Sequence, residues 1–208
     1  MWRRLVGCLF LLAFTAFLES ERLLAQTEIV IETELGPMEA ILDDSKAPAT
    51  VRNFLQYVDQ GRYAGGRFHR TVRTNPDNQP LSAVKIDVIQ GGVAPEFQGH
   101  DFPPIALERS NITALRHTDG SLSMARGAPD SATSDFFICV GDQPELDFGG
   151  KRNPDGQGFA VFGLVVSGMD VVRAIHRSPA GPSESEEKVA AGNQRLSPPI
   201  RILRIRRK

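Results

Sequence analysis

Cysteine is scarce in this chain of 208 residues, which contains only Cys8 and Cys139. Cys8 lies in the N-terminal segment and Cys139 lies inside an apolar run, so removal of that segment leaves no possible internal disulfide. The fold should therefore depend on its hydrophobic core rather than on cross-links. The four histidines are scattered, with no cysteine or carboxylate at ligand spacing, so we expect no metal site.

A strong net charge is missing too. The formal net charge is −1. Removing residues 1–25 would change it to −2, because this segment contains three arginines and two glutamates. A chain this close to neutrality gives no reason to expect a nucleic-acid partner.

An apolar run long enough to span a membrane is also absent. Leu5–Leu18 is uncharged and apolar, but it is shorter than the roughly 20 residues that a spanning helix needs. It follows a positively charged start, and Ala25 offers a small residue for cleavage before Gln26. This layout is typical of a secretory signal peptide, the alternative being an uncleaved N-terminal anchor. We therefore expect an exported protein, periplasmic or extracellular, that meets the membrane only through this segment.

Removal of residues 1–25 leaves residues 26–208, a length that suits one domain with a proper core. We expect this domain to be a monomer. Several common enzyme motifs are missing from it. Gln90-Gly91-Gly92 lacks the rest of a dinucleotide fingerprint, and Asp147-Phe148-Gly149 has no accompanying kinase motif. There is no Gly-x-Ser-x-Gly elbow, so neither a hydrolase nor a metal-dependent enzyme is indicated.

Short apolar runs predict a mainly β fold. Glu28–Leu42 predicts two strands joined at Gly36-Pro37, a hairpin signature. At the end of the chain, Ile200–Lys208 alternates apolar residues with arginines at the period of a strand, which predicts a solvated arginine face. Further strands are expected at Arg67–Val72, Lys85–Gln90, Ser121–Ala125, Phe136–Val140 and Phe159–Val165. Many short strands, with first and last strands able to pair, indicate a closed barrel.

Two helices should cap this barrel. The first has Asp44 or Ser45 as its N-cap and Pro48 in its first turn, and it should end at Gly61. The second is expected at Met169–Ile175. The main polar loops are predicted at residues 73–83, 147–158 and 178–199.

Five segments are individually weak signals but specific as an ordered set. They are Phe68-His69-Arg70, Gln90-Gly91-Gly92, Ser123-Met124-Ala125-Arg126, Ser131–Ile138 and Phe159–Gly163. Together they resemble the cyclophilin family of peptidyl-prolyl cis-trans isomerases, the bacterial exported kind above all, over nearly all of Glu28–Lys208. The resemblance implies an eight-stranded antiparallel barrel with a helix at each end. It also implies an enzyme that rotates X-Pro bonds and assists protein folding outside the cytoplasm.

This reaction needs neither nucleophile, metal nor cofactor, because no covalent bond is made or broken. It needs an apolar grip on the proline ring and a cation beside the proline nitrogen. The resemblance implies that Arg70 is the catalytic cation and that proline-containing polypeptides are the substrates. The residues implied to bind substrate are Gln90 at the peptide backbone, Ala125 and Arg126 along the substrate main chain, Phe137 at the pocket floor, Leu146 at its wall, and Val88, Asp135 and Phe159 at further groove positions.

Several positions depart from the family pattern. Asp135 replaces a glutamine, Asp87 and Val88 replace an aromatic residue and a methionine, Glu145 replaces an aromatic residue, Phe159 replaces a histidine or tyrosine, and extra residues occur within Thr74–Val84. These changes keep open an alternative function, a catalytically weak or inactive proline-peptide-binding module of chaperone type.

We expect Asp135 to hold Arg70 by a charge-assisted hydrogen bond, which would either orient the guanidinium or partly neutralise it. Asp87 and Glu145 should remove apolar wall from the pocket, which would favour substrates with basic residues beside proline. Glu145 is harmless if it points to water.

Overall fold

The computed structural model describes residues 26–181 and 193–208. The expected signal segment and part of the loop expected at 178–199 lie outside these residues. The strands are β1 (Gln26–Thr33), β2 (Gly36–Asp43), β3 (Arg67–Val72), β4 (Val88–Gly92), β5 (Ser121–Met124), β6 (Phe136–Cys139), β7 (Ala160–Ser167), β8 (Ala180–Gly181) and β9 (Arg195–Arg207). The helices are α2 (Pro48–Asp59), α3 (Ser110–Thr113) and α4 (Met169–Arg177), with 3-10 turns η1 (Pro95–Phe97) and η2 (Pro144–Leu146).

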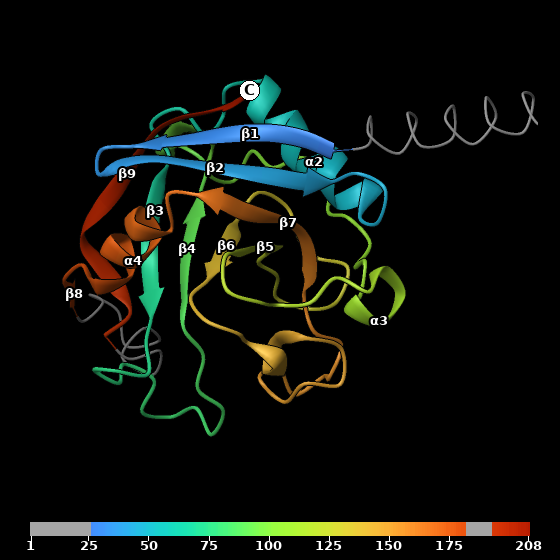
Figure 1. Cartoon of the computed structure of the whole chain (residues 1–208), viewed down its shortest axis with the longest axis vertical. Helices are drawn as coiled ribbons and strands as arrows, with labels where there is room; N and C mark the ends of the chain where they lie inside the picture. Colours follow the sequence, from blue (N-terminus) through green and yellow to red (C-terminus); the bar gives the residue numbers. More distant parts are fainter. Residues whose placement is uncertain (1–25, 182–192) are drawn as a thin grey trace, which may run out of the picture.

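Eight of the strands close into an antiparallel barrel (Figure 1). The order is β1-β2-β7-β5-β6-β4-β3-β9, and β9 pairs back with β1, while the two-residue β8 extends the outer edge of β9. The expected pairing of the first and last strands is therefore confirmed, with Ile31 opposite Ile205. Closure leaves the main strands without free edges, which protects them from pairing with other chains.

Alternation along the strands sorts side chains between the core and the surface. Ile29 and Ile31 of β1 are fully buried. In β9, the arginines between the buried isoleucines are exposed, as the sequence predicts. Glu32 accepts hydrogen bonds from Arg204 at 2.8 Å and from Arg206 at 3.0 Å across the β1–β9 pair. The solvated arginine face is therefore an ion-pair ladder rather than a row of free charges.

An aromatic cluster fills the barrel. Phe136 of β6 lies at its centre, with ring centroids 5.5 Å from Phe54, 5.5 Å from Tyr63 and 5.7 Å from Phe68. All three contacts are close to edge-on, the arrangement that aromatic quadrupoles favour. Phe54 comes from α2, so this cluster joins the helix to the barrel.

The two expected helices are present as α2 and α4, and α3 is a further single turn. α2 packs against β2, β7 and β9, and α4 packs against β2, β3 and β4. Apolar side chains of both helices belong to the same hydrophobic core. No helix within residues 26–181 or 193–208 is long and apolar enough to cross a membrane.

The expected N-cap of α2 is wrong. The helix begins after Ala47, which makes no side-chain cap. Instead, the Glu108 carboxylate accepts hydrogen bonds from the backbone N–H groups of Ala49 at 3.1 Å and Thr50 at 2.8 Å. A carboxylate from a distant segment satisfies these free donors as a local cap would, and its charge suits a helix N-terminus.

β5, β6 and β7 differ from the expected ranges by one or two residues, and three other strand boundaries differ in ways that have a structural reason. The first hairpin turns at residues 34–35, so Gly36-Pro37 opens β2 instead of forming the turn. β4 starts at Val88 rather than Lys85, because residues before it bind the inserted loop. β9 starts at Arg195, inside the segment expected to be a loop. Its two prolines fall where the β3–β9 register shifts, at positions where no ladder hydrogen bond needs their missing N–H.

Candidate functional site

Consecutive side chains of β6 point to opposite faces of the strand, so they alternate between the barrel core and the candidate site. Phe136 and Ile138 belong to the barrel core, whereas Phe137 and Cys139 join a second apolar cluster. A cavity of about 290 Å³ opens beside this second cluster. It is lined by Arg70, Ile86, Val88, Gln90, Ala125, Arg126, Phe137, Leu146, Arg152, Asn153 and Phe159. Every substrate-binding residue expected from the sequence lines it except Asp135.

The floor and walls of this cavity are apolar. The Phe137 ring lies edge-on to Phe159, with centroids 5.4 Å apart at 90°. Leu146, Ile86 and Val88 pack beside Phe137 and are almost fully buried. Such a slot suits a compact apolar ring.

Arg70 is the cation at the edge of this slot. Its Nε and Nη2 donate to Gln194 Oε1 at 2.9 and 2.6 Å, and its Nη1 donates to Gln90 Oε1 at 2.9 Å. Burial, with the positive charge of Arg152 adding to it, lowers the pKa of Arg70 to about 10. The guanidinium therefore remains protonated at pH 7, and neutral amide oxygens orient it without cancelling its charge.

Asp135 does not bind Arg70 directly, so the direct hydrogen bond expected from the sequence is wrong. Its Oδ2 accepts from Gln90 Nε2 at 2.9 Å, and the same amide turns its Oε1 to Arg70. Asp135 lines a neighbouring hollow of about 490 Å³, where its Oδ2 lies 3.5 Å from His69 Nε2. A Cβ at position 92 would collide with the Asp135 carboxylate, so a larger residue than Gly92 would displace this side chain.

Arg126 is bound to the long loop between β6 and β7. Its two terminal nitrogens pair with Asp155 at 2.8 and 3.0 Å, its Nε donates to the Gly158 carbonyl at 2.8 Å, and its guanidinium lies 5.0 Å from the Phe159 ring centroid. The Ala125 N–H donates to the Asp135 carbonyl at 2.9 Å. Ala125 and Arg126 therefore form one side of the cavity, and the charge of Arg126 is already paired with Asp155.

Comparison with known proteins identifies this arrangement. The family model described as cyclophilin type peptidyl-prolyl cis-trans isomerase/CLD matches residues 28–207. The chain belongs to the cyclophilin family. Peptidyl-prolyl cis-trans isomerase A of Dickeya dadantii is 38% identical over 175 residues, covering 83% of either chain. Peptidyl-prolyl cis-trans isomerase B of Escherichia coli is 37% identical over 163 residues, covering 77% of this chain and 91% of the relative.

Solved structures agree on the fold of this cyclophilin. A cyclophilin type isomerase of Cryptosporidium parvum superimposes with a TM-score of 0.64 at 21% identity, over 88% of this chain and 98% of that chain. The same protein solved in the presence of the dipeptide Ala-Pro gives 0.62 at 22% identity. The family match and the named relatives make this cyclophilin a peptidyl-prolyl cis-trans isomerase.

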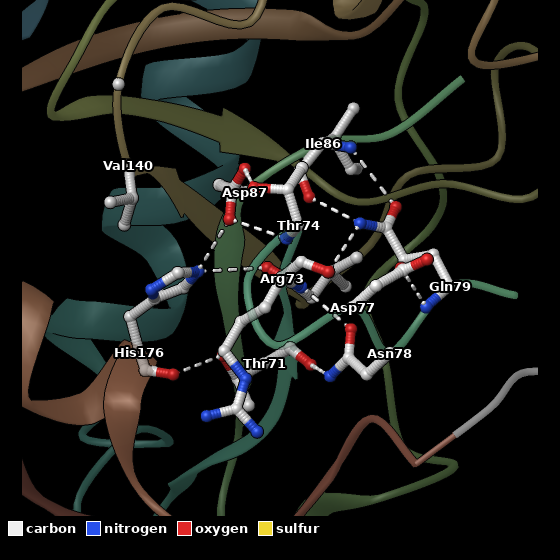
Figure 2. Close-up of polar contacts among 12 residues, drawn as sticks. Thr71, Arg73, Thr74, Asp77, Asn78, Gln79, Ile86, Asp87, Val140 and His176 are labelled. Carbon is white, nitrogen blue, oxygen red and sulfur yellow. Dashed lines mark hydrogen bonds and ion pairs between the residues drawn. The ribbon is translucent and has the colours of Figure 1, made fainter.

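Asp87 does not intrude on the cyclophilin pocket, contrary to the sequence-based expectation. Its carboxylate accepts from the Thr74 N–H at 2.9 Å and from the Thr74 hydroxyl at 2.8 Å, and it lies 3.3 Å from His176 Nε2 (Figure 2). The side chain points away from the cavity, and Ile86 supplies the apolar wall instead. The pocket therefore stays apolar at this position.

Glu145 also lies outside the lining of the cavity. Its carboxylate accepts from the Lys151 N–H at 2.8 Å and so stabilises the start of the following turn. The harmless alternative is thus the one that the structure favours for Glu145. Asp87 and Glu145, the two acidic residues expected to remove apolar wall from the pocket, therefore both stabilise neighbouring loops instead.

The residues inserted between β3 and β4 support the site. Asn78 and Gln79 are almost fully buried, and Figure 2 shows their amides turned into the loop. The Asn78 carbonyl accepts from Gln194 Nε2 at 3.0 Å, and Gln79 Oε1 accepts from Arg152 Nη1 at 2.8 Å. The insertion therefore positions Gln194, which binds Arg70, and Arg152, whose charge acts on Arg70.

Sequence reasoning missed Gln194, Arg152, Asn153 and Ile86. Gln194 lies 124 positions after Arg70, in a stretch without periodicity or motif. Arg152 and Asn153 occur in a loop whose composition predicts only turns. Ile86 could have been found as the apolar neighbour of Asp87, had the direction of the strand been known.

A buried Ser–His–Asp hydrogen-bond chain lies behind the pocket. His117 Nδ1 is 2.8 Å from Asp147 Oδ1, and its Nε2 is 3.0 Å from Ser123 Oγ. Ser123 is completely buried, so a substrate carbonyl has no access to its hydroxyl. The His117 ring stacks on Phe137 at 5.9 Å and 9°, so the chain supports the pocket floor.

Cys139, which the sequence places inside an apolar run, is fully buried. Burial raises the pKa of its thiol, so the thiol stays protonated at neutral pH. Within residues 26–181 and 193–208, no group of three or more His, Cys, Asp or Glu side chains is placed to hold a metal ion.

Proposed function

We propose that this cyclophilin isomerises X-Pro bonds of polypeptides by holding the proline ring on Phe137 with Arg70 as the catalytic cation. The planar amide resists rotation with a barrier of about 18–20 kcal/mol. As the bond twists, the proline nitrogen loses conjugation and regains a lone pair that can accept a hydrogen bond. A fixed cation beside it stabilises the twisted amide more than the planar one, which is the requirement for catalysis.

The observation that carries this proposal is the way Arg70 is held. A guanidinium has five N–H donors, and three hydrogen bonds to Gln90 and Gln194 use three of them. Two donors, one on each terminal nitrogen, remain for substrate. Because its partners are neutral, Arg70 keeps a full charge in a half-buried position, where electrostatic effects exceed those in water.

The test is a protease-coupled isomerisation assay of the purified protein on proline tetrapeptides. Uncatalysed isomerisation takes roughly 10–100 s, so acceleration is directly visible. We expect a rate that rises in proportion to enzyme concentration. A folded protein that leaves the uncatalysed rate unchanged would favour the alternative of a peptide-binding module.

Asp135 should act by positioning Gln90. Asp135→Ala frees the Gln90 amide to rotate away from Arg70, so we expect kcat/KM to fall by about 3- to 10-fold, the effect of losing one oriented hydrogen bond. Asp135→Asn retains an acceptor oxygen and should stay within about 2-fold of the intact protein. A rise in activity for both variants would instead mean that the carboxylate weakens Arg70 by neutralising it.

We also propose that residues 1–25 direct export and that the enzyme assists folding outside the cytoplasm. The charged start, the apolar stretch and Ala25 support this. β1 starts at Gln26, so cleavage there would spare all described strands. Mass spectrometry of the protein from fractionated cells should give a mature N-terminus at or near Gln26. An intact N-terminus in the membrane fraction would point to the anchor, and one in the cytoplasm would contradict export.

A further inference from the structure

The charged groups around the proline cavity are all positive. Arg70, Arg126 and Arg152 line it, and no aspartate or glutamate is among its lining residues. Arg126 is neutralised by its two-point contact with Asp155. Arg70 is bound only by the amides of Gln90 and Gln194. The cavity therefore carries excess positive charge within the described chain.

Arg152 contributes a second guanidinium that is paired with neutral oxygens alone. Its Nη1 donates to Gln79 Oε1 at 2.8 Å and to the Val84 carbonyl at 2.6 Å. No carboxylate in residues 26–181 or 193–208 lies within 4.0 Å of its nitrogens. Burial lowers the pKa of Arg152, which reflects a charge held partly out of water without a counter-ion.

The position of Arg152 is fixed rather than adventitious. Gln79, which holds it, is only 1% exposed. The Gln79 amide is itself fixed, because its Oε1 accepts from the Ile86 N–H at 3.1 Å and its Nε2 donates to the Arg73 and Ile86 carbonyls at 2.9 and 2.8 Å. The inserted loop thus places Arg152 at the cavity at an electrostatic cost to Arg70, whose pKa its charge lowers.

The acidic groups that could have offset this charge are directed elsewhere. Asp87 binds Thr74, and Glu145 binds the Lys151 N–H. Asp135 lines the neighbouring hollow, and although its charge acts to raise the pKa of Arg70, it forms no ion pair with Arg70 or Arg152. An anionic group on the substrate would therefore meet two guanidiniums, Arg70 and Arg152, neither of which is paired with a carboxylate. Ion pairing in this site is stronger than at the open surface.

We propose that Arg152 binds a carboxylate on the residue next to proline, so that this cyclophilin prefers substrates with glutamate or aspartate beside the isomerised bond. The inference rests on the proposed function, because it assumes that the proline ring occupies the cavity. It reverses the preference for basic neighbours that the sequence suggests. Arg152 lines the same cavity of about 290 Å³ as Phe137 and Arg70. With the proline ring on Phe137, a side chain on the residue next to proline is therefore within reach of Arg152.

The test compares tetrapeptides, acetylated and amidated at their ends, that carry glutamate or glutamine immediately before or immediately after proline. We expect kcat/KM for the glutamate peptide to exceed that for its glutamine partner by about 5-fold at one of the two positions, within the range of a charge-assisted contact. The ratio should fall toward 1 in 1 M salt, where the screening length is about 3 Å.

Variants assign the preference to Arg152. Arg152→Gln should bring the ratio close to 1, whereas Arg152→Lys keeps the charge and should keep most of the preference. Arg52→Gln removes the same charge from the exposed face of α2 and should leave the ratio unchanged. A ratio of 1 at both positions in the intact protein, or an unchanged ratio in Arg152→Gln, overturns the proposal.

Failure of the proposed function has a different signature, because no peptide would then be isomerised faster. In that case fluorescence anisotropy of the same labelled peptides measures binding without catalysis. Tighter binding of the glutamate peptide that is lost in Arg152→Gln would still support the proposal, and equal binding of both peptides would refute it. If Arg152→Gln does not fold, two other measurements test the proposal. A preference for glutamate that is kept in Arg152→Lys and lost in 1 M salt supports it, and a preference that salt leaves unchanged refutes it.

Discussion

Replacing Arg70 with alanine is expected to lower kcat/KM on proline peptides by about 100-fold or more, the loss typical of removing one oriented donor from a site of developing charge. The physical reason is that Arg70 offers the positive charge beside the twisted amide, with two N–H donors unused by Gln90 and Gln194. The other two cations that line the cavity are held by other partners, Arg126 by Asp155 and Arg152 by Gln79 and the Val84 carbonyl. The measurement is the protease-coupled assay at pH 7.

Two controls separate catalysis from folding. Arg70→Lys keeps a charge but lacks the planar fork that both glutamines hold, so its activity should lie between those of the intact protein and Arg70→Ala. Arg52→Ala, on the exposed side of α2, should keep full activity. Circular dichroism checks that the barrel is intact in each. Activity of folded Arg70→Ala within 3-fold of the intact protein would remove Arg70 from its catalytic role.

Replacing Phe136 with alanine should lower the free energy of unfolding by about 3–5 kcal/mol, the usual cost of truncating a buried aromatic side chain. Phe136 is fully buried and touches three aromatic neighbours that come from α2, β3 and the segment between them. Its loss leaves a cavity where helix and barrel meet, and their backbones limit how far it can collapse. Urea denaturation followed by fluorescence or circular dichroism measures the change.

Phe148→Ala is the matched control, because it removes the same group from a side chain that is 40% exposed. Its effect should stay within about 1 kcal/mol, since much of the ring already meets water. Equal destabilisation by the two variants would show that the aromatic cluster is not the centre of the core. Phe137→Ala, one residue along β6, should instead affect activity more than Phe136→Ala does at temperatures where both are folded, because its ring faces the cavity.

Much of the architecture was predictable because it follows from local patterns. The two-residue period of β1 and β9 places Ile29 and Ile31 inside and the arginines outside. The helical spacing of Phe54 and Val58 identifies the buried face of α2. Five ordered motifs, each spanning a few neighbouring residues, were enough to recognise the family and to assemble most of the cavity lining.

The orientation of individual charges was not predictable in this way. Asp87 precedes a strand whose direction decides whether its carboxylate enters the pocket, and tertiary contacts with Thr74 and His176 turn it out. Glu108 replaces the local cap of α2 from 59 positions away. Such contacts depend on which loops meet in space, and no short stretch of sequence encodes that.

The sequence by itself therefore determined the barrel, its two main helices and Arg70 as the candidate catalytic residue, because periodicity and ordered motifs are properties of neighbouring residues. Only the tertiary structure decided what surrounds Arg70. Gln194, Gln79 and Arg152 reach the site from three separate loops, and their geometry leaves the guanidinium oriented by neutral amides and the cavity positively charged. The physical reason is that hydrogen-bond partners and local charge balance are set by distances between segments, which exist only once the chain has folded.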